Sequence, residues 1–362
     1  MTQTLTAPGT GGSTSPAFRA QLAESLTDQA LHLIVLPTEQ CNFRCTYCYE
    51  DFTVGRMDEA VVGGIKRLID RRAADLRRLD VSWFGGEPLL ARPIVEELSA
   101  HLADLAAARP GLHYRADMTT NGYLLDTGTA RRFAGLGVDR YQISLDGPAE
   151  AHDTTRLRAD GRGSFDRIWR NLLAIRDSAL PVRVLLRVHL TPANLPLMPG
   201  FLARLRDTFL RDERFTLHLK PVERMGGPND RTMEILDQGL RPKVLDELTA
   251  VAYDGLPAAP EPDELPVCYA ARPNSLVIRA DGTVGKCTVA LTDPANAIGR
   301  LLPDGTLRID DERLAPWVRG WAAGDESAVH CPYAAMDRPA PAPAPAPALL
   351  QIGRRPAPAA RG

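Results

Sequence analysis

The chain carries an unusual run of residues at positions 40–50, which reads QCNFRCTYCYE. It contains Cys41, Cys45 and Cys48, three of the six cysteines in the chain, spaced as C-x3-C-x2-C. Thiolates this close together can share one soft metal centre, either an iron–sulfur cluster or zinc. Three cysteines leave one iron of a four-iron cluster without a protein ligand, so a small molecule could bind at that iron.

Three interpretations of this cysteine run compete. Buried structural cysteines would be inert, but three within eight residues directly after a predicted strand are unusual for that role. Structural zinc needs four ligands, and no nearby His or Cys completes the set, since His32 lies within the preceding apolar run. We therefore favour an iron–sulfur centre with an open iron.

The rest of the chain has the composition of an ordinary globular protein. Its 362 residues are 44% apolar and 24% charged, with a formal net charge of -2. This balance favours neither nucleic acid nor an anionic membrane as a partner. No apolar run approaches the ~20 residues of a membrane span, and the N-terminus lacks the pattern of a secretory signal. We expect a cytoplasmic protein whose cysteines serve metal or redox chemistry rather than disulfides.

The region from residue 31 to residue 220 alternates between strand and helix patterns. Strands are predicted at 31–36, 79–84, 112–118, 139–145, 182–190 and 214–220, and helices at 17–30, 58–79, 93–108, 127–136, 164–178 and 197–210. Six such units in a row predict an α/β fold with a parallel sheet and right-handed crossovers. The pattern does not separate an incompletely closed barrel from an open doubly wound sheet. In both folds, the loops after the strands meet at the edge where ligands bind.

Three further motifs follow strands and would meet the cysteine run at that edge. They are GGEP at 85–88, TTNG at 119–122 and SLDGP at 144–148. Two glycines let the backbone approach a ligand closely, and Glu87 adds a carboxylate that could hold an ammonium group. Taken singly, each motif could be an ordinary turn or helix cap. The run HDTTR ends at Arg156, which could contact a carboxylate in bidentate fashion or lie on a helix surface.

Together these motifs resemble the radical S-adenosylmethionine (SAM) superfamily, over residues 31 to about 220. The resemblance rests on the cysteine spacing with an aromatic residue before the third cysteine, then GGEP, TTNG, and SLDGP with HDxxR. It implies a partial (β/α)6 TIM-like barrel and a [4Fe-4S] cluster on the three cysteines. SAM would bind at the open iron. Cleavage of SAM by one electron would then give a 5′-deoxyadenosyl radical, which abstracts hydrogen from a substrate.

The same resemblance implies which residues bind SAM. Tyr47 would lie near the adenine, and the stretch Gly85, Gly86 and Glu87 would hold the methionine amino group. Candidates for ribose or carboxylate contacts are Asn121, Ser144 and Arg156.

A second group of cysteines lies near the C-terminus. The run SLVIRADGTVGKC predicts a β-hairpin, and Cys268 and Cys287 have the spacing C-x13-G-x4-C. This resembles the start of a SPASM or twitch extension, which carries auxiliary iron–sulfur clusters, mostly in enzymes that modify peptides. Cys331 follows after 43 residues, but the further cysteines of a full SPASM domain are missing. We expect at most one auxiliary cluster on these three cysteines, with an open fourth site or one filled by His330; the alternative is no metal.

The expected organisation has five parts. They are a flexible segment with a short helix (1–30), the radical SAM partial barrel (31–220), a linker with a helix near 241–253 (221–265), a truncated SPASM/twitch-like domain (266–335) and a disordered Pro/Ala-rich tail (336–362). About 40 residues precede Cys41, which is too few for a winged leader-binding domain.

The leading functional hypothesis is an enzyme that modifies a ribosomally made peptide, through a crosslink or another change at a side chain or Cα. Its expected partners are a precursor peptide and an electron donor such as flavodoxin or ferredoxin. A separate leader-binding protein is expected if neither the barrel nor the small domain binds the leader. Alternatives are formylglycine-type oxidation of a protein serine or cysteine, a reaction on a small molecule, and a non-catalytic iron–sulfur scaffold. The oxidation would need a general base, for which Glu223 is one candidate.

Overall fold

The computed structural model describes residues 16–257, 267–334 and 336. A ten-stranded sheet runs through this part of the chain, in the order β12-β11-β10-β9-β1-β3-β4-β5-β7-β8. Six consecutive strands of it are parallel and match the predicted strands closely: β1 (Ala30–Val35), β3 (Arg78–Trp83), β4 (His113–Thr120), β5 (Val138–Ser144), β7 (Arg183–Leu190) and β8 (Phe215–Pro221). The predicted α/β fold with a parallel central sheet is confirmed.

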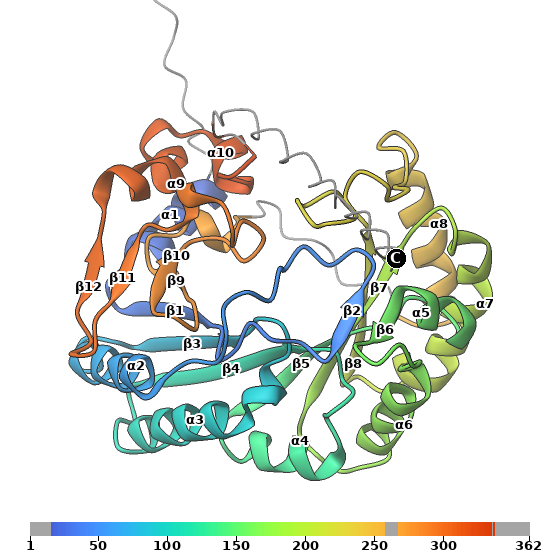
Figure 1. Cartoon of the computed structure of the whole chain (residues 1–362), viewed down its shortest axis with the longest axis horizontal. Coiled ribbons are helices and arrows are strands. Elements are labelled where there is room, and N and C mark those ends of the chain that lie inside the picture. Colours follow the sequence, from blue (N-terminus) through green and yellow to red (C-terminus); the bar gives the residue numbers. More distant parts are fainter. Residues whose placement is uncertain (1–15, 258–266, 335, 337–362) are drawn as a thin grey trace, which may run out of the picture.

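Helices cover the outer side of this curved sheet (Figure 1). They are α2 (Glu59–Arg72), α3 (Arg92–Ala107), α4 (Thr127–Ala134), α6 (Phe165–Arg176) and α7 (Met198–Leu205), which continues as a π-helical turn (Arg206–Leu210). Helix α2 is capped at its N-terminus by Asp58, whose side chain accepts a hydrogen bond from the Val61 N–H. It ends well before the predicted residue 79. The reason is that the N–H groups of Arg77 and Arg78 bond to Gln29 and so begin the pairing of β3 with β1.

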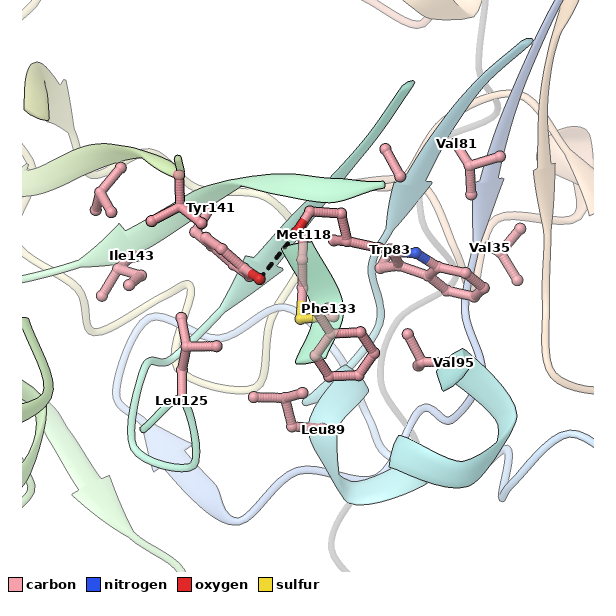
Figure 2. Close-up of a cluster of buried hydrophobic side chains, with 14 of the residues drawn as sticks. Val35, Val81, Trp83, Leu89, Val95, Met118, Leu125, Phe133, Tyr141 and Ile143 are labelled. Atoms are coloured by element: carbon pink, nitrogen blue, oxygen red, sulfur yellow. Dashed lines mark hydrogen bonds between the residues drawn. The ribbon is translucent and has the colours of Figure 1, made fainter. Parts of the chain in front are cut away.

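The main core lies between the sheet and these helices. Figure 2 shows its centre, where strand side chains such as Trp83, Met118 and Ile143 meet Leu89 and Phe133. Along β3 every second residue is buried, so that the residues between them face the inner side of the sheet. Burying each large apolar side chain stabilises the fold by about 1.5–3 kcal/mol. Apolar packing against the helices therefore stabilises the outer side of the sheet, and polar residues lie on its inner side.

The six parallel strands do not close into a barrel. Strand β1 pairs on its free side with β9 (Ser275–Ile278), which forms the predicted hairpin with β10 (Thr283–Gly285). Gly282 has φ +83° in the hairpin turn, a conformation that glycine adopts without strain. Two short strands, β11 (Gly299–Leu301) and β12 (Leu307–Ile309), extend the sheet further. The sheet thus runs unbroken across the predicted boundary near residue 266, and the division into five parts stays a prediction.

Four more helices lie in the linker and near the two ends of the described structure. The linker contains α8 (Arg241–Ala252), near its predicted position, and the two ends contain α1 (Pro16–Leu26), α9 (Asp311–Ala323) and α10 (Glu326–His330). Helix α1 packs on α9, where the Phe18 and Trp321 rings lie 5.2 Å apart. No described helix is both long and apolar enough to cross a bilayer. Residues 1–15, most of the Pro/Glu-rich link and the Pro/Ala-rich tail after residue 336 lie outside the described residues.

An ion pair with a buried carboxylate joins the β9–β10 hairpin to Glu39, the residue directly before the cysteine run. Arg279 donates through Nε and Nη2 to the two carboxylate oxygens of Glu39, at 2.9 and 2.6 Å. Removing one partner would leave the other charge buried. We therefore expect Arg279→Met to lower the free energy of unfolding by about 3 kcal/mol, measured by urea denaturation. Arg300→Met, at an exposed position on β11, should change it by less than about 0.5 kcal/mol. Equal effects of the two substitutions would contradict this role for the pair.

Candidate active site

A cavity lies at the carboxyl ends of the parallel strands. Its lining contains Cys41, Cys45 and Cys48 together with six of the seven predicted SAM-binding residues: Tyr47, Gly85, Gly86, Asn121, Ser144 and Arg156. The structure therefore brings the four sequence motifs to one place. Lining residues that the sequence reasoning did not single out include Tyr49, Gln142, Arg187, His189 and Lys220.

The cysteine run is shaped by a small second sheet that was not predicted. Strand β2 (Phe43–Cys45) pairs antiparallel with β6 (Arg156–Arg158), and this pairing puts Cys45 opposite Arg156. Each strand is only three residues long, too short for a periodic signal. Phe43, which belongs to the run, has a buried side chain, and its N–H donates to the Cys41 sulfur at 3.3 Å.

The three cysteines fit an iron–sulfur cluster in their chemistry and placement. All three are free thiols that are partly exposed to the cavity. Burial raises the pKa of Cys41 and of Cys48 to about 12, and it raises the pKa of Cys45 as well. Such thiols need a cationic centre to hold them as thiolates. Among the described residues, no group of three or more His, Cys, Asp or Glu side chains has an arrangement that could hold a single metal ion.

The two glycines of GGEP are required by packing against the cysteine run. Gly85 has φ +108°, and a Cβ atom there would collide with the Thr38 carbonyl oxygen. A Cβ on Gly86 would collide with the Gln40 carbonyl group. The N–H of Glu87 also donates to the Gln40 oxygen at 2.9 Å. The GGEP loop and the cysteine run therefore form one tightly packed unit at the cavity wall.

Glu87 differs from its predicted role, because its carboxylate does not line the cavity. The side chain is fully buried and accepts hydrogen bonds from the Thr120 hydroxyl (2.8 Å), the Asn121 N–H (2.8 Å) and the Leu89 N–H (3.0 Å). Burial raises the pKa of Glu87, although these hydrogen bonds oppose the rise. Glu87 thus connects the GGEP loop to the TTNG loop through hydrogen bonds. It positions Asn121, whose side chain donates to the side chain of Asn42 at 2.7 Å.

Tyr47 is the centre of a buried hydrogen-bond network. Its hydroxyl donates to Asp146 at 2.7 Å and accepts from Arg156 at 2.6 Å. The Nδ1 atom of His189 lies 3.1 Å from both the Tyr47 hydroxyl and an Asp146 oxygen. Burial alone would raise the pKa of Asp146, but the hydrogen bond and charge of His189 outweigh it and hold that pKa below its usual range. The network links the cysteine run to the ends of β5 and β7.

The HDxxR motif has three separate roles. His152 is buried in α5 (Ala149–Thr155), and its Nδ1 accepts from the Asp146 N–H at 3.3 Å. Asp153 accepts from the N–H groups of Ser164 and Phe165 at the start of α6. Only Arg156 reaches the cavity. Two of the three motif residues therefore support the loops, and one lines the site.

Glu223, the candidate general base, lies at the cavity but is engaged in ion pairs. Lys220 donates to one of its oxygens at 2.5 Å and Arg241 to the other at 2.8 Å. Burial opposes these contacts, yet together they lower the pKa of Glu223. A carboxylate stabilised in this way is a weak proton acceptor.

The three C-terminal cysteines lie in one neighbourhood beside this cavity. Cys268 begins a short 3-10 turn, Cys287 follows β10, and Cys331 follows α10. Burial raises the pKa of Cys268, and the nearness of Cys287 and Cys331 adds to that rise. The two residues after Cys287 line the cavity wall. His330 is exposed, and its predicted role as a fourth ligand stays untested.

The Tyr47 network yields a prediction for SAM binding. Tyr47→Phe keeps the ring but leaves Arg156 and Asp146 without the hydroxyl that joins them. Losing a hydrogen bond to charged groups costs about 1.5–3 kcal/mol, so we expect the dissociation constant for SAM to rise about tenfold or more, measured by equilibrium dialysis. The matched control is Tyr141→Phe, whose hydroxyl donates to Val138 within the core (Figure 2). Unchanged SAM affinity in Tyr47→Phe, with the cluster intact, would count against this role.

Fold and site together define an α/β domain that gathers three cysteines at a cavity beside the carboxyl ends of its parallel strands. Residues 35–202 match the family model of the radical SAM superfamily, and this region is a radical SAM domain. The family implies a [4Fe-4S] cluster and SAM. The residues on the cavity fit both groups.

Curated relatives include enzymes with different substrates. The chain is 32% identical over 192 residues to GTP 3′,8-cyclase of Mycobacterium sp. (strain KMS), covering 50% of this chain and 49% of that protein. It is 29% identical over 176 residues to the serine-type anaerobic sulfatase-maturating enzyme of Klebsiella aerogenes, covering 46% and 42%. The chain therefore spans about half the length of the curated relatives it matches.

Solved structures with a similar fold extend over more of the chain. The structure of anSMEcpe with bound AdoMet and Cp18Cys peptide has a TM-score of 0.60 at 18% identity, covering 81% of this chain and 82% of that one. Streptococcus suis SuiB bound to precursor peptide SuiA has a TM-score of 0.55 at 14% identity, covering 84% and 69%. At these identities the likeness shows the shared fold alone.

Proposed function

We propose that this chain is a radical SAM enzyme that cleaves SAM reductively and modifies a ribosomally made peptide. The observation that carries the proposal is the convergence of Cys41, Cys45 and Cys48 with six predicted SAM-binding residues on one cavity. The bound cluster would supply the electron that splits the sulfonium C–S bond of SAM into methionine and a 5′-deoxyadenosyl radical.

The protein side chains have distinct tasks in this proposal. The three cysteines hold the cluster, and the backbone of Gly85 and Gly86 lies beside it to receive the methionine end of SAM. Asn121, Ser144 and Arg156 offer polar groups to the ribose and carboxylate. Two of these side chains are held in place by hydrogen bonds: Asn121 by Asn42, and Arg156 by Tyr47. Such fixed groups orient a reactive cofactor at little entropic cost.

Two features favour a peptide as the second reactant. The sheet stays open beyond β8, which leaves one side of the partial barrel unpaired within the described chain. The fold is also shared with anSMEcpe and SuiB, whose structures were solved with peptides bound. We further propose that Cys268, Cys287 and Cys331 hold one auxiliary cluster beside the cavity. It would accept the electron released in the second step or bind a substrate thiolate.

The test uses reconstituted protein, SAM, a chemical or flavodoxin reductant and a precursor peptide encoded beside its gene. We expect 5′-deoxyadenosine and a change in peptide mass in comparable amounts. Formation of 5′-deoxyadenosine without any mass change in the peptide would contradict the peptide substrate.

A small-molecule substrate is the second candidate, because GTP 3′,8-cyclases are among the relatives. The same reconstituted protein incubated with GTP distinguishes the two. The peptide proposal predicts that GTP is recovered unchanged. Consumption of GTP in step with 5′-deoxyadenosine formation would favour the small-molecule reaction instead.

A further inference from the structure

Arg187 is a charged side chain in the cavity, and no residue within the described part of the chain pairs with it. It lies on β7, is half-buried and lines the same cavity as the cysteines. Its Nε atom is buried without a hydrogen bond, and the guanidinium forms no ion pair with any residue in the described ranges. Burial lowers the pKa of Arg187, yet a guanidinium stays charged at neutral pH. Holding such a charge away from water has a free-energy cost that a ligand could offset.

The other basic side chains of the cavity are already engaged. Arg156 donates to Tyr47 at 2.6 Å, and Lys220 donates to Glu223 at 2.5 Å. Asp146, a buried acid whose charge acts on Arg187, already accepts from Tyr47 and from Thr155 at 2.7 and 2.8 Å. Arg187 is thus available to bind a ligand that enters the cavity.

The strand order places Arg187 on the side of the cavity away from the GGEP loop. The predicted SAM-binding loops follow β3, β4 and β5, whereas Arg187 is paired in register between Ser144 of β5 and His218 of β8. Lys220 lies two residues further along β8 and lines the same wall. This wall is therefore the one that remains for the second reactant once SAM occupies its predicted contacts.

We propose that Arg187 binds a carboxylate of the substrate, supplied by an Asp or Glu side chain or by the C-terminus of the peptide. The inference rests on the proposed function, because it assigns the substrate to this wall. The planar guanidinium can donate two parallel hydrogen bonds to one carboxylate, which fixes both the position and the orientation of the bound segment. The enzyme would then select peptides with an acidic group close to the hydrogen that is abstracted.

The test compares two probes, N-acetylglutamate N-methylamide and its glutamine counterpart. Dissociation constants are measured by calorimetry on reconstituted protein saturated with SAM. The wild type should bind the glutamate probe about tenfold to a hundredfold more tightly than the glutamine probe. Arg187→Gln should abolish this preference, and Arg187→Lys should restore part of it. The matched control is Arg183→Gln, an exposed arginine on the same strand and face that does not line the cavity.

The outcomes separate the possible sources of the carboxylate. If Arg187→Gln weakens SAM binding and leaves the probe preference unchanged, the residue holds the SAM carboxylate and the inference is wrong. A preference that is absent from the wild type, or that persists in Arg187→Gln, also overturns it. Failure of the peptide proposal would appear differently, as 5′-deoxyadenosine formation without peptide modification.

Discussion

Replacing Cys45 with alanine is expected to reduce 5′-deoxyadenosine formation to about one thousandth of the wild-type rate or less, a loss of about 4 kcal/mol in transition-state stabilisation. Cys45 lies on the cavity opposite Arg156, between the two other thiols in sequence. With two thiolates left, the cluster would lose one of its three cysteine ligands. The measurements are anaerobic iron content, the absorbance of the cluster and chromatographic detection of 5′-deoxyadenosine.

The matched control for this prediction is Cys331→Ala, which removes a cysteine of the second group. It should keep the cavity cysteines and the ability to cleave SAM. If Cys45→Ala and Cys331→Ala reduced SAM cleavage equally, the assignment of the cluster to the first group would be wrong.

Replacing Gly86 with alanine is expected to weaken SAM binding by about a hundredfold, a loss of about 2.7 kcal/mol in binding free energy, because the loop that receives the methionine end of SAM is displaced. The added Cβ would collide with the carbonyl group of Gln40 and with the Glu39 oxygen, which are backbone atoms of the cysteine run. GGEP and the cysteine run would have to separate. Equilibrium dialysis with labelled SAM measures the effect.

Gly111→Ala is the control for this second prediction, since a Cβ there has no atom within 4 Å. It should leave SAM affinity unchanged. Wild-type affinity in Gly86→Ala, with the fold and iron content retained, would show that the close packing of the two loops does not position the cofactor.

The parallel sheet was predictable because strand and helix patterns alternate six times between residues 31 and 220, with polar or glycine-rich loops after most of the strands. The same regularity predicted that the motifs converge, since loops after parallel strands share an edge. Glu87 shows the limit of this reasoning. A carboxylate beside two glycines suggests a ligand contact, but whether its oxygens are free depends on Thr120 and Asn121, which belong to another strand end.

The sequence reasoning missed Arg187 and His189, which line the cavity from β7, although the sequence contains a signal for them. In VRVLLRVHL, the polar residues Arg183, Arg187 and His189 are separated by four and two positions, so they share one face of an otherwise apolar strand. That even spacing indicates a strand with one partly polar face, which in this fold is the inner face. The pairing of β9 with β1 had no comparable signal, because it joins segments that lie more than two hundred residues apart in the sequence.

The most direct measurement of the central claim is SAM cleavage by the wild-type protein. The protein is reconstituted with iron and sulfide, reduced with dithionite and incubated anaerobically with SAM, and 5′-deoxyadenosine and methionine are quantified. The account predicts equal amounts of the two products, formed only when reductant and cluster are both present. A protein that binds a [4Fe-4S] cluster and SAM but leaves SAM intact under these conditions would contradict it.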